Sequence, residues 1–449
     1  MKRFKIERSN AEITSQSGLA LIGQAIKLHT NLSQELDKQV PLRHGIAHSS
    51  IIKSYLGLLC VGKNDFEAIN TIDSELFYTS ALNIKELPSE ATLRQRMDQQ
   101  AQSYLPIVVK ASWAFLKRSK PKLEPLVTGH IPLDADVTPM DNSKTSKEGV
   151  SRTYKGYDGF APMIIYLGQE GYCLDLQLRE GKQHSQKGTP QLLARALKNA
   201  QQVTDLPLLS RLDGGNDSIE NVDIVLEHNE QFPEKPPVDF IIKWNPRKED
   251  PQHWLDHAER NAEWTVVREG KRVAVFSIYH QKVWKGYEYT VRRVMRVIER
   301  TIDKHGQVLL APEIEIEGWW TSLLNDEALV IKLYADHGTS EQFHSEFKTD
   351  LDIERLPSGK FNTNELVLAC SMLAFNLLRW VGQNGLMGPR SPKRNKAKRR
   401  RIKTVIQELM MVAARIVHTA RYVKLVFGEG CRALYSFQEL YEKLAYGYG

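Results

Sequence analysis

Carboxylates follow the ends of two predicted strands, where they could gather into one site. Asp134 and Asp136 lie in Leu133-Asp-Ala-Asp-Val-Thr138, and because alternate strand residues share a face, both could point the same way. Asp213 ends another predicted strand and is followed by two glycines, which let a ligand approach the backbone closely. Open α/β sheets bind ligands beyond the carboxyl ends of their strands, and hard divalent cations prefer oxygen ligands. The alternative is that each aspartate is only a turn or cap residue.

A further set of chemically capable residues has the spacing of one helix face. Tyr334, His337, Glu341 and Lys348 stand at offsets of 0, 3, 7 and 14, which at 3.6 residues per turn places them roughly above one another. Gly338 weakens the first turn, so Tyr334 could instead end a preceding strand. The alternative interpretation is a solvated polar face without chemistry.

The elements that must position these residues follow from the apolar periodicity. Residues 11–130 are mostly helical in spacing, and Ser89 is a typical N-cap for a helix over Glu90–Tyr104 that ends before Pro106. From residue 131 the period shortens toward two. The order of three strands, helix, strand, helix and strand predicts an α/β fold with a mixed sheet.

About ninety residues with strand-like stretches come next and are interpreted as a β-rich insertion. A helix at about 339–351, a buried helix at 363–381 and a closing apolar helix at about 402–418 complete the prediction. The expected division is a helical domain, the first part of the core, the β-rich insertion, the second part of the core and a basic helical region, at residues 1–130, 131–245, 246–333, 334–384 and 385–449.

Charge is unevenly distributed along the chain. The 449 residues carry 61 Lys and Arg against 54 Asp and Glu, a net charge of +7. Residues 385–449 contribute +10 and residues 1–130 contribute +5, which leaves −8 in the middle. Basic ends favour a polyanionic partner, and an acidic centre in such a protein suggests carboxylates kept for metal ions.

Composition excludes several classes of protein. Hydrophobic residues make up 41% and charged residues 26%, as in ordinary globular chains. The four cysteines are far apart, which predicts neither a disulfide framework nor a zinc site and favours a reducing cytoplasm. The first residues lack the apolar core of a signal peptide. The apolar run Leu366–Val381 is too short to span a bilayer and contains Asn376 and Arg379, so no membrane partner is expected.

The helix-face residues resemble a motif of the DDE transposases of bacterial insertion sequences, in the branch with a β-rich insertion. That motif is Tyr-x2-Arg-x3-Glu-x6-Lys, and this chain has Tyr334-x2-His337-x3-Glu341-x6-Lys348. Three positions match, and His337 replaces the usual Arg. An imidazole is neither permanently charged nor bidentate, so the resemblance implies only a partial phosphate contact there at neutral pH.

Other segments are similar to this family in the right order. The strand ending at Thr138 is similar to the family's first-Asp strand, which selects Asp136 over Asp134, and Arg211-Leu-Asp-Gly-Gly215 resembles the segment that carries its second Asp. Arg179-Glu-Gly-Lys-Gln-His-Ser185 resembles a turn after the family's hairpin. The resemblance covers most of residues 15–380.

The resemblance implies a ribonuclease-H-like fold in which Asp136, Asp213 and Glu341 bind two Mg²⁺ ions, with Mn²⁺ as a substitute. It implies cut-and-paste transposition: cleavage at the element's ends, through a hairpin, followed by strand transfer. The implied partners are the terminal inverted repeats and target DNA, held by a homodimer in a synaptic complex. The expected location is the bacterial cytoplasm, in association with the nucleoid.

Contacts to DNA are expected from several parts of the chain. Basic and aromatic residues beside the carboxylates would hold phosphates, a Trp pair in the insertion would stack on a flipped base, and basic residues near both ends would bind the duplex. These residues are Tyr334, His337, Lys348, Arg211, Trp319, Trp320, Arg94, Arg96, Lys398, Arg399, Arg400 and Arg401. Because Trp319 and Trp320 point to opposite faces of a strand, one of them is expected to be buried.

Two other classes of function remain open from the sequence. One is a DNA-binding protein derived from a transposase, which would typically have lost a carboxylate. The other is a ribonuclease-H-like nuclease that only hydrolyses. The three carboxylates, the intact insertion and the two basic flanks favour a transposase over both.

Overall fold

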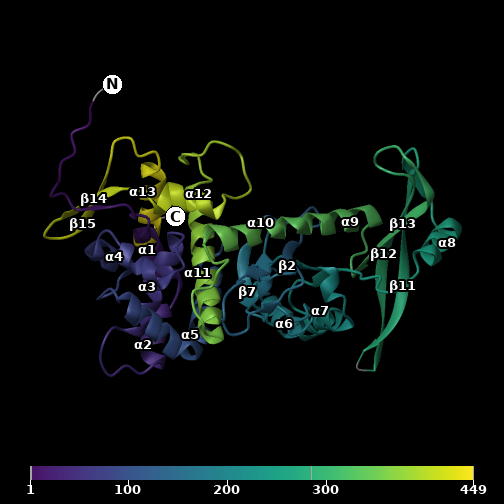
Figure 1. Ribbon diagram of the computed structural model, residues 1–449, viewed down its shortest axis with the longest axis horizontal. Helices are drawn as coiled ribbons and strands as arrows, with labels where there is room; N and C mark the ends of the chain where they lie inside the picture. Colours follow the sequence, from purple (N-terminus) through teal and green to yellow (C-terminus); the bar gives the residue numbers. More distant parts are fainter. Residues whose placement is uncertain (1–2, 285, 448–449) are drawn as a thin grey trace.

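The computed structural model describes residues 3–284 and 286–447. The helices predicted before residue 131 form a bundle at one end of the molecule (Figure 1). These helices are α1 (Leu19–His29), α2 (Leu32–Gln39), α3 (His48–Cys60), the 3₁₀ helix η1 (Phe66–Thr71), α4 (Glu75–Leu82) and α5 (Glu90–Ser119). The Ser89 Oγ accepts a hydrogen bond from the backbone N–H of Thr92, which confirms the predicted N-cap. The predicted end before Pro106 is wrong. Proline removes only one helical hydrogen bond, and the buried face of α5 packs along the long helix α11 (Phe361–Gly385) on both sides of it.

The core sheet has the predicted order of elements. Its strands and crossing helices are β2 (Ile131–Val137), β6 (Met163–Leu167), β7 (Tyr172–Gln177), α6 (Thr189–Ala200), β8 (Leu208–Leu212), α7 (Ile219–Gln231) and β9 (Val238–Lys243). In space the strand order is β9-β8-β2-β6-β7. Strands β9, β8 and β2 are parallel to one another, and β6 runs antiparallel to its two neighbours, β2 and β7. This is the mixed sheet that the order of elements predicted, with the ribonuclease-H-like arrangement that the family resemblance implied.

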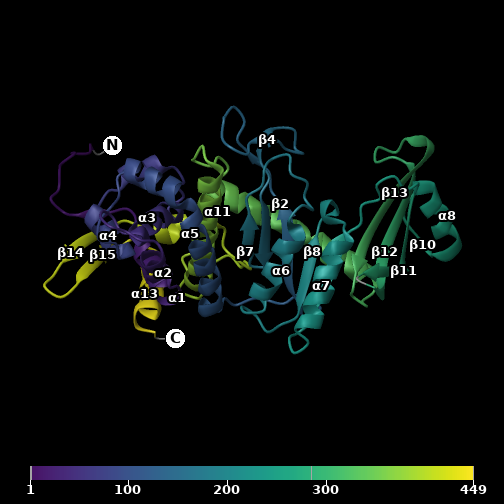
Figure 2. The ribbon, with the colours of Figure 1, turned by 90° about the horizontal axis from the view of Figure 1, so that it is seen from below.

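The β-rich insertion continues this sheet instead of forming a separate one. Its strands are β10 (Trp264–Arg268), β11 (Lys271–Trp284), β12 (Tyr287–Ile302) and β13 (Val308–Thr321), and β13 pairs antiparallel with β9. The result is a nine-stranded sheet that reaches the far end of the elongated molecule (Figures 1 and 2). The sequence missed helix α8 (Pro251–Asn261), which the Asp250 side chain caps.

A nearly continuous helical rod carries the motif residues. It consists of α9 (Glu327–Ala335), η3 (Asp336–Gly338), α10 (Thr339–Ser345) and the π-helical turn η4 (Glu346–Asp350). Tyr334 is therefore helical and does not end a strand. Gly338 does not interrupt the rod, because its φ of −54° and ψ of −14° are right-handed helical values. In Figures 1 and 2 this rod lies on the side of the core strands opposite to α6 and α7.

The apolar run near residue 366 lies inside α11. This helix is long and apolar enough to cross a membrane, but 94% of its most apolar window is buried inside the protein. It packs on α3, α5 and β7, so it is the central helix between the bundle and the core sheet.

The predicted closing helix at 402–418 is wrong after residue 410. The chain forms α12 (Ile402–Val405) and the π-helical turn η5 (Ile406–Met410), then β14 (Ala414–His418), β15 (Val423–Phe427) and α13 (Leu434–Tyr446). β14 becomes a strand because it pairs with β15 and with β1 (Ile13–Thr14) at the other end of the chain. The two basic ends of the sequence therefore lie together at one end of the molecule (Figure 1).

A glycine lies where the β6–β7 hairpin packs against the rod. Gly171 has a φ of +70°, and a Cβ there would lie 2.4 Å from the ring of Phe343, which is buried in α10. The hairpin and the rod therefore approach each other too closely for any side chain at this position.

We expect Gly171→Ala to lower the free energy of unfolding by about 2–4 kcal/mol, because backbone strain and overpacking add. Gly306→Ala is the matched control, since Gly306 has a φ of +86° but no atom within 4 Å of an added Cβ, and it should cost about 1–2 kcal/mol. Urea unfolding of both variants measures the difference. Equal losses would show that Phe343 does not hold the hairpin against the rod.

Candidate active site

Three charged side chains form a buried layer where β2, β8 and the rod meet. Asp134 and Arg211 are register partners on the parallel strands, and Nε and Nη2 of Arg211 donate to the two oxygens of Asp134 at 2.6 and 2.7 Å. Nη1 of Arg211 also donates to the carbonyl of Leu333 at 2.6 Å. His337 Nδ1 lies 3.0 Å from Asp134 Oδ1. One carboxylate therefore ties both strands to the rod.

Electrostatics keep this layer charged. Burial opposes ionisation of Asp134, but Arg211 and His337 lower its pKa to about 2. Burial also opposes the cationic form of His337, but Asp134 raises the pKa of the imidazole above its ordinary value. The Arg211 and His337 side chains are therefore committed to Asp134. The prediction that Arg211 and His337 contact DNA is corrected, because both residues are buried in this ion pair.

Asp136 and Asp213 lie next to this layer, toward the carboxyl ends of β2 and β8. Each comes two residues after a member of the buried pair, so each repeats its orientation toward the same face of the sheet. Both are half-buried, and burial together with the charge of Asp136 raises the pKa of Asp213. In the described chain neither forms an ion pair with Lys or Arg. Two repelling carboxylates without a Lys or Arg partner have the donor chemistry that a divalent cation requires.

Two hydrogen bonds fix these carboxylates locally. The side-chain amide of Asn216 donates to Asp213 Oδ1 at 2.6 Å, and the backbone N–H of Val137 donates to Asp136 Oδ1 at 2.7 Å. In each case the second carboxylate oxygen remains able to accept another ligand.

Glu341 lies on the part of the rod that faces these strand ends. It follows His337 by four residues and precedes His344 by three, so the three share one helix face. His337 contacts Asp134, and His344 Nε2 lies 3.4 Å from Asp136 Oδ2, so this face looks toward β2. Glu341 itself is exposed, and within the described chain no three or more His, Cys, Asp or Glu side chains are grouped to hold a metal ion. For Glu341 to be a third ligand, its side chain must turn toward the aspartates.

Two tyrosines border the carboxylates. Tyr334 packs between Trp319 and His337, and burial and the nearby aspartates raise its pKa. Tyr154 was missed by the sequence analysis, because nothing in a loop tyrosine predicts which strand end it reaches. Burial, Asp136 and Asp213 raise the pKa of Tyr154 to about 12. Both phenols therefore stay protonated at neutral pH and can donate to an anion.

Lys348 connects the rod to the end of β2. Its ammonium group donates to the carbonyl of Pro139 at 3.1 Å and lies 3.2 Å from the carboxylate of Glu354. The predicted phosphate contact would therefore compete with two partners inside the protein.

The predicted tryptophan pair divides between core and surface, as strand alternation requires. Trp319 is 2% exposed and packs under the ammonium group of Lys243, 4.4 Å from its ring centroid, so it does not stack on a base. Trp320 lines a hollow of about 700 Å³ between the insertion and the start of α7, and its indole N–H donates to Asp217 at 2.9 Å.

The guanidinium of Arg293 lies at the centre of this hollow. It is within 4.4, 4.8 and 4.9 Å of the ring centroids of Trp244, Trp254 and Trp320. His280 packs edge-on against Trp320 at 5.0 Å. The sequence analysis missed Arg293, because strand periodicity places it in the insertion without showing which rings surround it.

The other predicted DNA contacts also have partners inside the protein. Arg94 pairs with Glu90, and Arg96 lies 2.8 Å from His48 Nδ1. In the basic run, the side chains of four residues contact protein groups: Lys398 contacts Gln169, Arg399 contacts Glu346, Arg400 contacts the carbonyls of Leu386, Lys393 and Asn395, and Arg401 contacts Asp350. The predicted phosphate contacts of Arg399, Arg400 and Arg401 would therefore compete with partners inside the protein, and they stay predictions.

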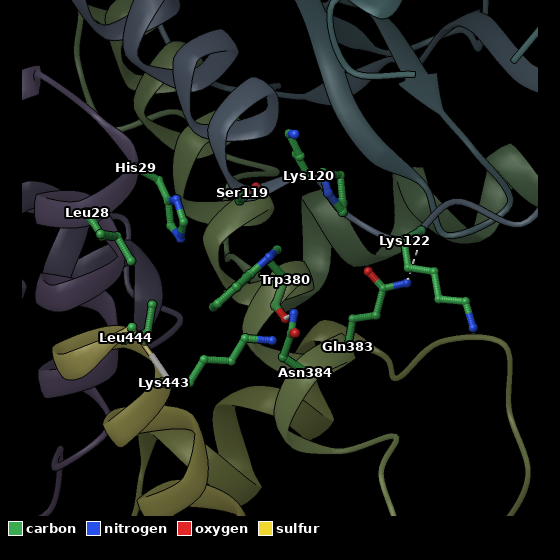
Figure 3. A pocket seen from close by; sticks show the side chains of 12 residues that line it. Leu28, His29, Ser119, Lys120, Lys122, Trp380, Gln383, Asn384, Lys443 and Leu444 are labelled. Atoms are coloured by element: carbon green, nitrogen blue, oxygen red, sulfur yellow. Dashed lines mark hydrogen bonds between the residues drawn. The ribbon is translucent and has the colours of Figure 1, made fainter. Parts of the chain in front are cut away.

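A second hollow, of about 440 Å³, lies among α1, α5, α11 and α13 (Figure 3). Lys120, Lys122 and Lys443 border it, and Trp380 and His29 lie edge to face at 5.5 Å beside it. Among the described residues no Asp or Glu lines it, so it lacks the carboxylates that favour a hard cation.

Comparison with known proteins agrees with this geometry. Residues 1–446 match the family described as Transposase DDE domain group 1. The chain belongs to this family of DDE transposases. The transposase is therefore an enzyme of DNA transposition, and enzymes of this family use divalent metal ions. One solved structure that matches it is a cryo-EM structure of a piggyBac transposase synaptic complex with hairpin DNA, with 10% identity, a TM-score of 0.43, and coverage of 87% of this chain and 79% of that chain. A search among curated proteins finds no match.

The two neighbouring aspartates of β2 should differ in their effect on stability. Asp134→Asn leaves the buried Arg211 without its counter-charge, so we expect the free energy of unfolding at pH 7 to fall by about 3–5 kcal/mol. Asp136→Asn removes repulsion with Asp213 and should leave stability unchanged or raise it by up to about 1 kcal/mol. Urea unfolding measures both. A larger loss for Asp136→Asn would reverse the assignment of the structural and the metal-binding carboxylate.

The pH dependence of stability tests the charge of His337. In the folded protein the pKa of His337 lies above its ordinary value of about 6.5. The stability that the charged pair of His337 and Asp134 contributes is therefore fully present below about pH 6.5, and it is lost as the pH rises through the pKa of His337 in the folded protein. We expect His337→Gln, which keeps a hydrogen-bond donor, to cost about 1–3 kcal/mol at pH 5.5 and clearly less at pH 8.5. The same cost at both pH values would mean that His337 is neutral in the folded protein.

Proposed function

We propose that this transposase cleaves DNA at the ends of its element and joins the ends to target DNA, with Asp136, Asp213 and Glu341 as its catalytic carboxylates. The observation that carries this proposal is the position of Asp136 and Asp213, which repel each other without a Lys or Arg partner directly above a buried charged layer. The family match supports the reaction class, and the helix face shared with His337 and His344 supports Glu341.

The cofactor we propose is a pair of Mg²⁺ ions, which Mn²⁺ would replace. Bound at the strand ends, the ions would activate the attacking hydroxyl and stabilise the leaving oxygen of an in-line phosphoryl displacement. Asp136 and Asp213 would hold them from the sheet and Glu341 from the rod. Water and a DNA 3′-hydroxyl require the same activation, so one site serves both cleavage and joining.

The hollow beside Trp320 supports a role in excision through a hairpin. The half-buried ring of Trp320 and the imidazole of His280 line this hollow next to the loop that carries Asp213, and the buried guanidinium of Arg293 packs against the Trp320 ring. A base that leaves the duplex at a sharply bent DNA end would find stacking partners there.

The DNA partners we propose are the element's terminal inverted repeats and a target duplex, held by two copies of the transposase in a synaptic complex. The basic N-terminal and C-terminal segments support this, because the pairing of β1 with β14 places them together beside the helical bundle. Positive charge there would attract phosphates while the acidic middle of the chain is kept for metal ions. The expected place of action is the bacterial cytoplasm.

Mutation of the three carboxylates tests the proposal. We expect Asp136→Asn, Asp213→Asn and Glu341→Gln each to reduce Mg²⁺-dependent cleavage of end DNA by at least about 100-fold, because each removes a charge that holds the metal. Binding of the same DNA should change less than about twofold, since phosphate contacts elsewhere carry the affinity.

Asp303→Asn, in the exposed turn between β12 and β13, is the control and should cleave like the parent. Near-normal cleavage by Asp136→Asn would refute the assignment. Hydrolysis at the ends without any joining to target DNA would favour the alternative of a simple nuclease, and binding without hydrolysis would favour a transposase-derived DNA-binding protein.

A further inference from the structure

Two buried carboxylates follow Glu341 along the rod, and the C-terminal basic run neutralises both of them. Glu346, which is 2% exposed, begins the π-helical turn η4. Its Oε2 accepts hydrogen bonds from Nη2 of Arg379 and from the backbone N–H of Ile402, both at 2.9 Å. Its Oε1 lies 3.0 Å from Nη2 of Arg399. Two guanidinium groups thus share one buried carboxylate.

Asp350, at the end of the same turn, has a matching set of partners. Nε of Arg401 donates to Oδ2 at 2.9 Å and Nη2 donates to Oδ1 at 3.0 Å, which is a bidentate pair. The backbone N–H of Lys403 donates to Oδ2 at 2.9 Å. The Asp350 side chain is fully buried in this arrangement. Residues 399–403 therefore bind both ends of η4.

The same segment reaches the residue next to Glu341. Nη2 of Arg399 donates to Oε1 of Gln342 at 3.0 Å, and its guanidinium lies 4.7 Å above the ring of Phe343. Arg379 of α11 also binds this segment, because its Nη1 donates to the carbonyl of Arg400 at 2.7 Å. These contacts cover the rod from residue 342 to residue 350.

We propose that residues 399–403 are a clamp that positions the rod so that Glu341 faces Asp136 and Asp213. The inference rests on the proposed function of Glu341 and deepens it, since it makes Arg399 and Arg401 positioning residues for the same site. The physical reason is that a buried carboxylate without its partner is strongly unfavourable, so η4 keeps its place only while the clamp is bound. A π-helical turn is also a point at which a helix can change register.

The basic run therefore has two kinds of residue. Arg399 and Arg401 are used inside the protein, whereas Arg394 and Lys396 are exposed and, in the described chain, form no ion pair. Arg394 offers a control of the same residue type in the same run.

The first experiment measures hydrogen exchange of residues 339–350 in the full-length protein without metal and without DNA. We expect Arg401→Gln to speed exchange in this segment by about tenfold, because the bidentate pair with Asp350 is lost, and Arg401→Lys to restore part of the protection. Arg394→Gln should exchange at the parent rate. Parent-like exchange in Arg401→Gln would overturn the clamp.

The second experiment measures cleavage and end binding with the same variants. Arg401→Gln should cleave about tenfold more slowly with Mg²⁺ while binding end DNA within about twofold of the parent, and Arg401→Lys should recover part of the rate. Asp350→Asn, which weakens the pair from the rod side, provides a second variant if Arg401→Gln does not fold, and it should show the same pattern. Weakened DNA binding with a parent-like rate at saturating DNA would instead identify Arg401 as a phosphate contact and overturn the positioning role. A parent protein that shows no cleavage would contradict the proposed function alone, because the exchange measurement does not depend on it.

Discussion

The buried ion pair between Asp134 and Arg211 is the interaction on which the site depends. It joins two parallel strands, and through His337 and the carbonyl of Leu333 it also holds the rod. The three carboxylates that we propose as catalytic then follow by fixed steps of the backbone: two residues along each strand and four residues along the helix. Buried ion pairs are seldom a net source of stability, because desolvation offsets their attraction. Here the pair specifies which three segments meet and in which register.

The rod that carries Glu341 is held on both sides of that residue. His337 fixes it toward the sheet, and the partners of Glu346 and Asp350 fix it toward the C-terminal segment. Between these points the Glu341 side chain remains exposed, so it is free to turn toward the aspartates as the proposed role requires. In the described chain the site thus combines carboxylates that have no Lys or Arg partner with supporting carboxylates that are paired with Arg or His. Rigid supports of this kind are what precise positioning of reacting groups needs.

Sequence patterns predicted the parts of this arrangement that depend on near neighbours. Strand alternation placed Asp134 and Asp136 on one face, and the succession of elements predicted an α/β fold with a mixed sheet. The sequence could not show that Arg211 is committed to a residue 77 positions away, or His337 to one 203 positions away, so both were predicted to contact DNA. The prediction of a helix over 414–418 was wrong for another reason, because those residues pair along their whole length with Val423–Phe427 and, at one edge, with Ile13 and Thr14.

If the proposed function is right, the ends of β2 and β8 and the rod surround one metal site. Fe²⁺ bound in place of Mg²⁺, with ascorbate and peroxide, produces hydroxyl radicals that cut the polypeptide next to the metal. The account predicts three cuts, beside Asp136, Asp213 and Glu341, which excess Mg²⁺ suppresses and Asp136→Asn abolishes. Cuts confined to other segments, or cuts at these positions that persist in Asp136→Asn, would contradict it.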